Sequence, residues 1–214
     1  MTDVLSAAGL SLGLSATAVT LAALAGVPLA ALLGLSRSRR GDLLVLATRV
    51  AMSFPTVVVG LLVYGLLSRS GPLGSFGLLY TPQAIVIGEV ILAFPLVVTL
   101  GASAVAGLDP RFRDTVRILG LRPGRTALLA VSEAREGFVA AVLVAFARCV
   151  TELGVALLVG GNLAGRTRTL TTAIALETSR GDFARGLRLG ALLIAIALAV
   201  NVAAALSFRQ TERP

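Results

Sequence analysis

The chain has 214 residues, of which 56% are hydrophobic and 14% charged, and its mean hydropathy of +0.91 excludes an ordinary soluble domain, where about a quarter of residues are charged. It contains neither Lys nor His, which excludes a P-loop lysine, a Schiff-base amine, a Ser-His-Asp relay and a histidine zinc site. Its single cysteine, Cys149, excludes an internal disulfide. The 19 arginines lie between long apolar runs, which is typical of a membrane protein rather than a nucleic-acid-binding one.

Five apolar segments are long enough to cross a bilayer, which takes about 20 helical residues. In chain order the predicted spans are 11–35, 43–67, 83–107, 137–161 and 189–208. Because no basic residue precedes the first span, it is not expected to be a cleaved signal peptide. The apolar runs are continuous rather than alternating, which favours helices over a barrel. The sequence therefore predicts an all-α, polytopic membrane helix bundle that forms one domain over residues 1–214.

Proline and charged residues interrupt these spans. Pro28, Pro55 and Pro95 lie inside the first three spans and are expected to kink them. Arg49 lies near one end of the second span, where its side chain is expected to reach the interface, and Glu89 in the third is expected to bond within the bundle.

The arginines are distributed unevenly between the two sides of the predicted bundle. The segments 37–42 and 108–136, with the tail after Phe208, hold 11 arginines, and the opposite side holds 6. Since cytoplasmic loops are enriched in basic residues, the amino terminus is predicted to lie outside and the carboxyl terminus inside. The external loops are then 68–82 and 162–188, and the long cytoplasmic loop is 108–136.

The cytoplasmic loop begins with a short helix that the sequence delimits at both ends. Asp109 is suited to cap its free amide groups, Pro110 to its first position and Gly120 to a left-handed stop. An external segment near residues 170–179 is also helix-like.

Apolar side chains share one face of this capped cytoplasmic helix. Phe112, Val116 and Leu119 are spaced four and three residues apart, and the polar side chains lie mostly elsewhere: Arg111, Arg113, Asp114 and Arg117. Such a stripe is suited to docking on another protein, and an Arg-rich amphipathic helix is equally suited to lying on its own bilayer. The spacing alone leaves both interpretations open.

The fourth span contains two opposite charges. Arg148 and Glu152 are four residues apart, so they lie on one helical face and are expected to neutralise each other. The functional alternative is that Arg148, aided by Thr151, presents hydrogen-bond donors to a passing dianion.

Several segments together resemble a known family. They read Ser-Glu-Ala-Arg-Glu-Gly at 132–137, Ala-Phe-Ala-Arg at 145–148, Thr-Glu-Leu-Gly at 151–154 and Val-Gly-Gly-Asn at 159–162, followed by the Thr-rich stretch 167–182. This combination resembles the tungstate-type ABC permeases, relatives of the molybdate and sulfate permeases. The stretch 109–136 is similar to their cytoplasmic coupling loop: Gly120 matches its glycine and Asp114 replaces its Glu, while Thr115 and Val116 replace its two alanines.

The resemblance implies a type I ABC importer, in which two permease copies pair with two ATPase subunits and receive a tetrahedral oxyanion from an external binding protein. Tungstate is the expected cargo, with molybdate or sulfate as alternatives. No cofactor is expected in this chain, which is not itself an enzyme; ATP and Mg would bind to the partner ATPase. A secondary transporter or channel is the competing class, and it would not need the capped cytoplasmic helix.

The resemblance also assigns roles to residues. Those expected to couple to the ATPase are Asp109, Arg111, Phe112, Arg113, Asp114, Val116, Arg117, Leu119 and Gly120. Those expected to line the translocation pathway are Arg148, Thr151 and Glu152. Those expected to contact the binding protein are Gly160, Gly161, Asn162, Arg166 and Arg168.

Overall fold

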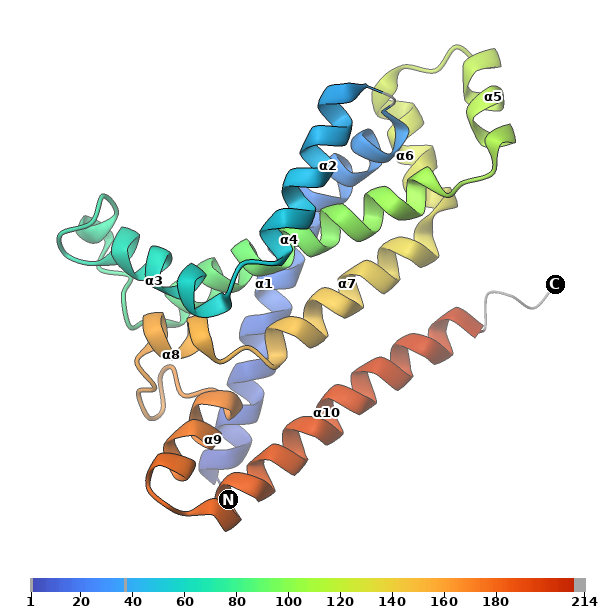
Figure 1. The fold of residues 1–214 in the computed structure, drawn as a ribbon. Coiled ribbons are helices and arrows are strands. Elements are labelled where there is room, and N and C mark those ends of the chain that lie inside the picture. The colour runs from blue at the N-terminus through green and yellow to red at the C-terminus, as the bar shows by residue number, and fades with distance from the viewer. Residues whose placement is uncertain (1, 37, 210–214) are drawn as a thin grey trace.

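The computed structural model describes residues 2–36 and 38–209, and the side chains of 4–36 and 38–202. Every regular element in this part of the chain is helical (Figure 1). The elements are α1 (Thr2–Leu35), α2 (Arg39–Met52), α3 (Thr56–Leu67), the 3-10 helix η1 (Gly74–Phe76), α4 (Pro82–Ala106), α5 (Pro110–Ile118), α6 (Pro123–Glu133), α7 (Arg135–Val150), α8 (Gly154–Gly160), α9 (Leu170–Ser179) and α10 (Phe183–Arg209). The all-α prediction is confirmed.

Three of the five predicted spans are continuous helices, and two are broken. By length and apolar composition, α1, α4 and α10 are each able to cross a membrane. The pair α2 and α3 bends by 98° and the pair α7 and α8 by 56°, so the chain has up to five spans if each bent pair counts as one. The expected kink at Pro55 in the second span is confirmed, whereas the break in the fourth span, 137–161, was not predicted. Pro55, which has no N–H to continue a helix, stands at the first break as the N-cap of α3.

Helices α1 and α4 form the centre of the molecule. Gly26 packs on Val97, and Gly34 packs on Ala102 and Val105, so the contacting positions rise together along both helices and the two run in the same direction. Small residues allow this close approach, as is common between membrane helices. Helix α7 runs in the opposite direction against α4, where the ring of Phe138 lies against Gly101.

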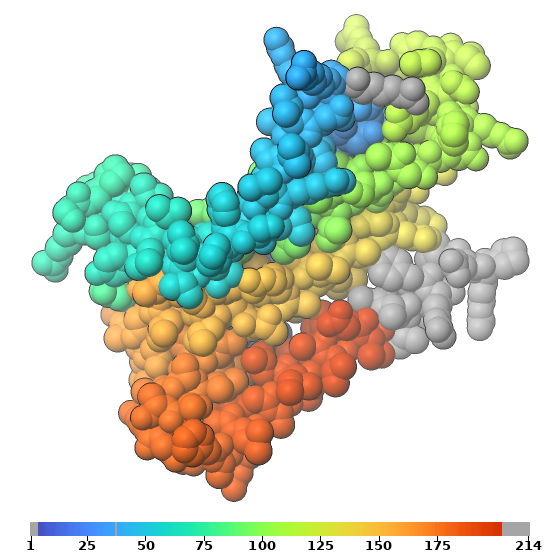
Figure 2. Space-filling model, viewed as in Figure 1, coloured from blue at the N-terminus to red at the C-terminus, as the bar shows by residue number. Residues whose placement is uncertain are grey.

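Helices α3 and α8 pack on each other beside the start of α4. Their buried contact is made mainly by valines, among them Val59, Val63, Val155 and Val159. The region from α3 to η1 projects as a lobe from the body of the molecule (Figure 2).

The helix predicted near residues 170–179 is confirmed as α9, which packs between the start of α1 and α10. Leu170 and Leu189 are buried together with Ala7 and Ala8, and the backbone N–H of Leu170 donates to Ser11 Oγ at 2.8 Å. Helix α10 begins at Phe183, before the predicted start of its span. Arg37 and Arg213, two of the arginines counted for orientation, lie outside the described residues.

The segment 108–136, which is predicted to be cytoplasmic, contains the helices α5 and α6 rather than a single helix. Helix α5 lies where the sequence predicts it, whereas α6 was not predicted. Helix α6 is anchored by Ala127 and Ala130, which are buried with Ala30 and Ala31 of α1. These small residues provided too weak an apolar signal to distinguish α6 from a basic loop.

Candidate functional site

The ends of α5 are capped as the sequence predicts. Asp109 Oδ1 accepts a hydrogen bond from the Arg111 backbone N–H at 2.8 Å, and Pro110 occupies the first helical position. Gly120 adopts a φ of 60°, and the N–H of Leu121 donates back to the Val116 carbonyl at 3.4 Å. This left-handed stop favours glycine because a side chain there would be strained.

The apolar stripe of α5 is divided between the chain itself and the surface. Phe112 is half-buried and packs against the cluster that includes Ala30 and Phe138. Val116 is also half-buried, whereas Leu119 is 60% exposed and its neighbour Ile118 is 85% exposed. The face that is free to meet a partner is therefore centred on Ile118 and Leu119 rather than on Phe112 and Val116.

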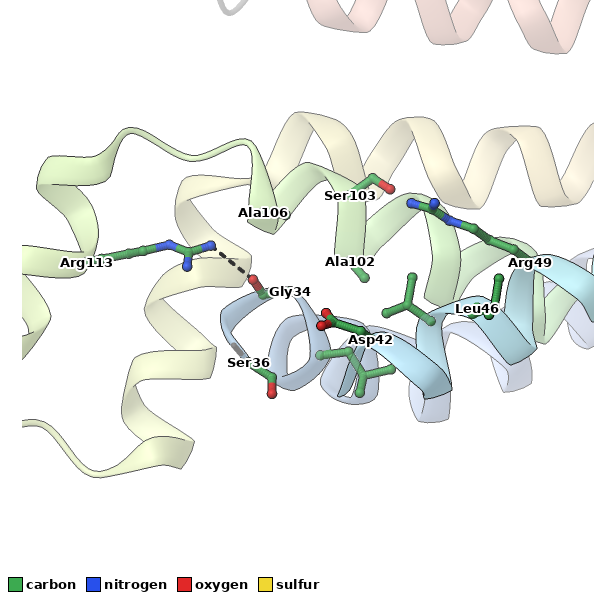
Figure 3. A pocket seen from close by; sticks show the side chains of 11 residues that line it. Gly34, Ser36, Asp42, Leu46, Arg49, Ala102, Ser103, Ala106 and Arg113 are labelled. Atoms are coloured by element: carbon green, nitrogen blue, oxygen red, sulfur yellow. Dashed lines mark hydrogen bonds between the residues drawn. The ribbon is translucent and has the colours of Figure 1, made fainter. Parts of the chain in front are cut away.

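The charged residues of α5 are divided in the same way. Arg111, Asp114 and Arg117 are exposed. Arg113 is half-buried, and its Nη2 donates to the carbonyl of Gly34, at the end of α1, at 3.1 Å (Figure 3). A hydrogen bond from a charged donor typically contributes about 1.5–3 kcal/mol. Sequence reasoning missed this contact because its partners are 79 residues apart.

A polar cleft of about 300 Å³ lies beside this contact, between α1, α2, α4 and α5. Figure 3 shows the side chains of Asp42, Arg49 and Ser103 around it, with Arg113 at one end. Arg49, which was expected to reach the interface from its span, is exposed here.

Arg148 and Glu152 form the predicted ion pair. Arg148 Nη1 lies 2.7 Å from Glu152 Oε2, and the side chains are 43% and 2% exposed, respectively. Thr151 is exposed, and its hydroxyl bonds back to the carbonyls of Ala147 and Arg148. The pairing is confirmed, and the proposed role of these residues in the pathway stays a prediction.

The carboxylate of Glu152 also begins the next helix. Its Oε1 accepts hydrogen bonds from the N–H groups of Gly154 at 2.8 Å and Val155 at 3.3 Å. These N–H groups belong to the first turn of α8 and have no acceptor within that helix, so Glu152 caps the helix that follows the bend. The sequence placed Glu152 on a continuous helix and therefore gave no indication of this second role.

A second buried carboxylate lies in α4. The side chain of Glu89 is near Ser15 of α1, and the residue is 2% exposed. Within the described part of the chain, neither Glu89 Oε2 nor Ser15 Oγ has a hydrogen-bond partner. The expected bonding of Glu89 within the bundle is therefore absent at one of its two oxygens, which is unusual for a buried polar group.

The predicted external contact residues form a tight turn after α8. Gly161 and Asn162 have φ values of 68° and 51°, and the Arg168 guanidinium donates to Asn162 Oδ1 at 3.1 Å. Gly160 is buried, and its carbonyl accepts from Thr167 Oγ1 at 2.6 Å. Arg166 is exposed. The turn is therefore fixed by its own side chains, with Arg166 free on its surface.

The fold and sequence are similar to those of known transport proteins. One solved structure, described as "Crystal structure of an amino acid ABC transporter with histidines", superposes on this fold with a TM-score of 0.70. The two chains are 19% identical in sequence, and the match covers 98% of this chain and 94% of the other. The chain is 41% identical over 206 residues to the "Probable anion ABC transporter permease protein" of Haloferax volcanii, covering 94% of this chain and 89% of that protein. It is 36% identical over 192 residues to the "Tungstate uptake system permease protein TupB" of Peptoclostridium acidaminophilum, covering 90% of this chain and 84% of that protein.

The sequence profile of one family extends over most of the chain. This family is described as "Binding-protein-dependent transport system inner membrane component", and its profile matches residues 26–213. With apolar helices long enough to cross a membrane and two relatives above 30% identity along most of the chain, the protein belongs to this family of inner-membrane transport components.

Proposed function

We propose that this chain is the membrane-spanning permease subunit of an ATP-driven importer whose cargo is a tetrahedral oxyanion, tungstate foremost. The observation that carries the proposal is α5, a capped helix that stands away from the bundle (Figure 1). Its Ile118 and Leu119 side chains are exposed. A secondary transporter or channel has no need of such a helix. Family membership supports the role as permease, and the names of the relatives in Haloferax and Peptoclostridium support an anion and tungstate.

In this proposal the ATPase docks on the free face of α5. Burying Ile118 and Leu119 against a groove would contribute about 3 kcal/mol or more, and the exposed charges of Arg111, Asp114 and Arg117 would surround that contact. ATP and Mg bind to the partner, since this chain has no Lys for a P-loop. Closure of the ATPase subunits then moves the attached helices as rigid bodies between inward-facing and outward-facing states.

The complete assembly comprises two copies of this permease, two ATPase subunits and an external binding protein. The amino terminus lies outside, and the binding protein contacts the loops 68–82 and 162–188. The fixed turn after α8 supports this contact, because a turn held by its own hydrogen bonds loses little conformational entropy on docking. The residues proposed for it are Gly160, Gly161, Asn162, Arg166 and Arg168.

Arg148, Thr151 and Glu152 are the proposed polar positions of the translocation pathway. Glu152 orients the guanidinium of Arg148, which keeps part of its surface exposed and suits a tetrahedral oxyanion. The pair is neutral overall, so its hold on a dianion is weak, as an importer that must release its cargo requires. Discrimination among tungstate, molybdate and sulfate then belongs to the binding protein.

Co-purification with the ATPase tests the proposed function. The wild-type chain is expected to form a stoichiometric complex with the ATPase of its transport system, and that complex is expected to import tungstate when the binding protein is supplied. Uptake without the ATPase would contradict the proposal. Competition by molybdate and sulfate identifies the cargo, and import of an amino acid or a sugar in place of these anions would reject the oxyanion assignment.

The docking face is tested by a paired substitution. Ile118→Asn with Leu119→Asn removes about 3 kcal/mol of apolar burial and is expected to weaken ATPase binding about a hundredfold in a pull-down titration. Leu187→Asn, which changes an exposed side chain at the other end of the molecule, is the matched control and is expected to bind normally. Normal binding by the double variant would exclude this face as the docking surface.

A further inference from the structure

Helix α5 has little polar contact with the helices around it in the part of the chain that the structure describes. It stands away from the central helices at one end of the bundle (Figure 1). Among the hydrogen bonds of residues 2–36 and 38–209, the one from Arg113 Nη2 to the Gly34 carbonyl is the only one that links a residue of α5 to another helix. Phe112, the preceding residue, adds an apolar contact at the same place.

The acceptor of this bond belongs to the last turn of α1, where carbonyl groups have no partner within the helix. Ser38, four residues after Gly34, donates its backbone N–H to Ser36 Oγ at 3.2 Å instead of continuing the helix. A cation at this end also interacts favourably with the helix dipole. Arg113 therefore caps α1 from a helix 79 residues away.

Gly34 is itself fixed at the contact between α1 and α4. A Cβ atom at this position would lie 2.6 Å from the Ala102 carbonyl oxygen and 2.7 Å from Val105 Cβ, so the two backbones are already in close contact. A displacement applied to Gly34 is consequently passed to α4 as well as to α1. Close-packed interfaces of this kind move as units rather than deform continuously.

We propose that Arg113 is a positioning residue for coupling: it transmits the displacement of α5 by the ATPase to the α1–α4 contact through the Gly34 carbonyl. This inference rests on the proposed function and departs from the sequence-based expectation that Arg113 contacts the ATPase. The guanidinium is turned toward α1 (Figure 3), and its neighbours Arg111 and Asp114 remain exposed. Docking and transmission are thereby assigned to different side chains of one short helix.

The cleft next to this bond contains further charged groups. Asp42 and Arg49 of α2 line it, and within the described residues no ion pair joins Asp42, the acidic one of the two, to Arg113. The Gly34 carbonyl is therefore the partner that holds the Arg113 guanidinium in this structure.

Two arginine substitutions test the proposal. Arg113→Met removes the inward bond, and Arg125→Met removes an exposed charge of the neighbouring helix α6 and serves as the matched control. Each complex with the ATPase is reconstituted in lipid, and ATP hydrolysis is measured alone and with the tungstate-loaded binding protein. We expect Arg113→Met to assemble with the ATPase, to keep its basal hydrolysis within about twofold, and to lose stimulated hydrolysis and uptake about tenfold.

The control variants separate transmission from a merely structural role. Arg125→Met is expected to keep the wild-type ratio of stimulated to basal hydrolysis, and Arg113→Lys, which keeps a charged donor of similar reach, is expected to restore most of that ratio. If Arg113→Met does not accumulate, the same ratio is measured on Arg113→Gln, whose shorter side chain is expected to lower it about tenfold as well.

Two results would overturn the inference: an unchanged ratio in the Arg113 variant that accumulates, or loss of ATPase binding by that variant while Arg125→Met binds normally. The second result would make Arg113 a docking residue. Failure of the wild-type chain to bind an ATPase at all would instead reject the proposed function, so the two failures are distinguishable.

Discussion

The carboxylate of Glu152 serves two structural purposes at the break between α7 and α8. One oxygen pairs with Arg148, and the other accepts from the N–H groups of Gly154 and Val155. Its backbone carbonyl also accepts from Thr171 Oγ1 at 2.8 Å, which links the break to α9. A residue with this many buried partners determines the geometry of the bend as well as neutralising a charge.

Substitution of Glu152 is expected to separate its capping role from its pairing role. Glu152→Ala removes both, and since loss of a helix cap alone costs about 1 kcal/mol, we expect the free energy of unfolding to fall by about 2 kcal/mol or more. Glu152→Gln keeps an acceptor oxygen for Gly154 and loses the charge, so it should be less destabilised. Thermal unfolding of the purified protein in detergent measures both. Equal losses in the two variants would show that the cap contributes nothing.

At the scale of the element, α5 and α9 were predictable because their signals are local. Asp109, Pro110 and Gly120 define both ends of α5 through backbone chemistry that requires no distant residue. Which side of α5 faces the bundle was not predictable, because the spacing of Phe112 and Leu119 places them on one helical face without saying what covers it. Periodicity identifies a face, and only the tertiary arrangement assigns its partner.

The size of the first bend and the existence of the second were not predictable for a related reason. A hydropathy window counts apolar residues, and such a count does not distinguish a straight helix from a bent pair. Pro55 indicated the position of the first break, but the 98° bend depends on the packing of α3 against α8, where Gly60 lies beside the backbone of Gly154 and Val155. That contact joins residues almost a hundred positions apart along the chain, beyond any local pattern.

Two glycines of α1 provide a test of helix packing. Gly34→Ala places a methyl group 2.6 Å from a backbone carbonyl that has no room to move, so we expect it to cost about 1–3 kcal/mol of unfolding free energy. Gly13→Ala, in the same helix with nothing within 4 Å of its Cβ position, should be neutral or stabilising by up to about 1 kcal/mol. Thermal unfolding compares the two. A Gly34→Ala variant as stable as Gly13→Ala would indicate that α1 and α4 pack less closely around Gly34 than in this structure.

At the scale of the whole molecule, the amino-acid composition was sufficient to predict the fold class. It was not sufficient to predict which residues become neighbours along the proposed translocation pathway. The lack of Lys and the long apolar runs predicted a membrane bundle without its own nucleotide site. The arrangement of Glu89 beside Ser15, and the bond from Arg113 to Gly34, depend on which helices become neighbours. Those neighbours are chosen by small-residue contacts such as Gly26 on Val97, which many other pairs of Ala- and Gly-rich helices would satisfy about as well.

The orientation of the molecule gives a prediction that concerns all of its loops together. The positive-inside rule and the count of 11 arginines against 6 predict that α5 lies in the cytoplasm and α9 outside. Single cysteines introduced as Ser75→Cys and Ser179→Cys are therefore expected to react with a membrane-impermeant maleimide in right-side-out vesicles. Thr115→Cys should react only after the vesicles are opened. The natural Cys149 is buried and should contribute little background. Labelling of Thr115→Cys in intact vesicles would place α5 outside, where no ATPase could reach it, and would contradict both the coupling role of α5 and the transmission role of Arg113.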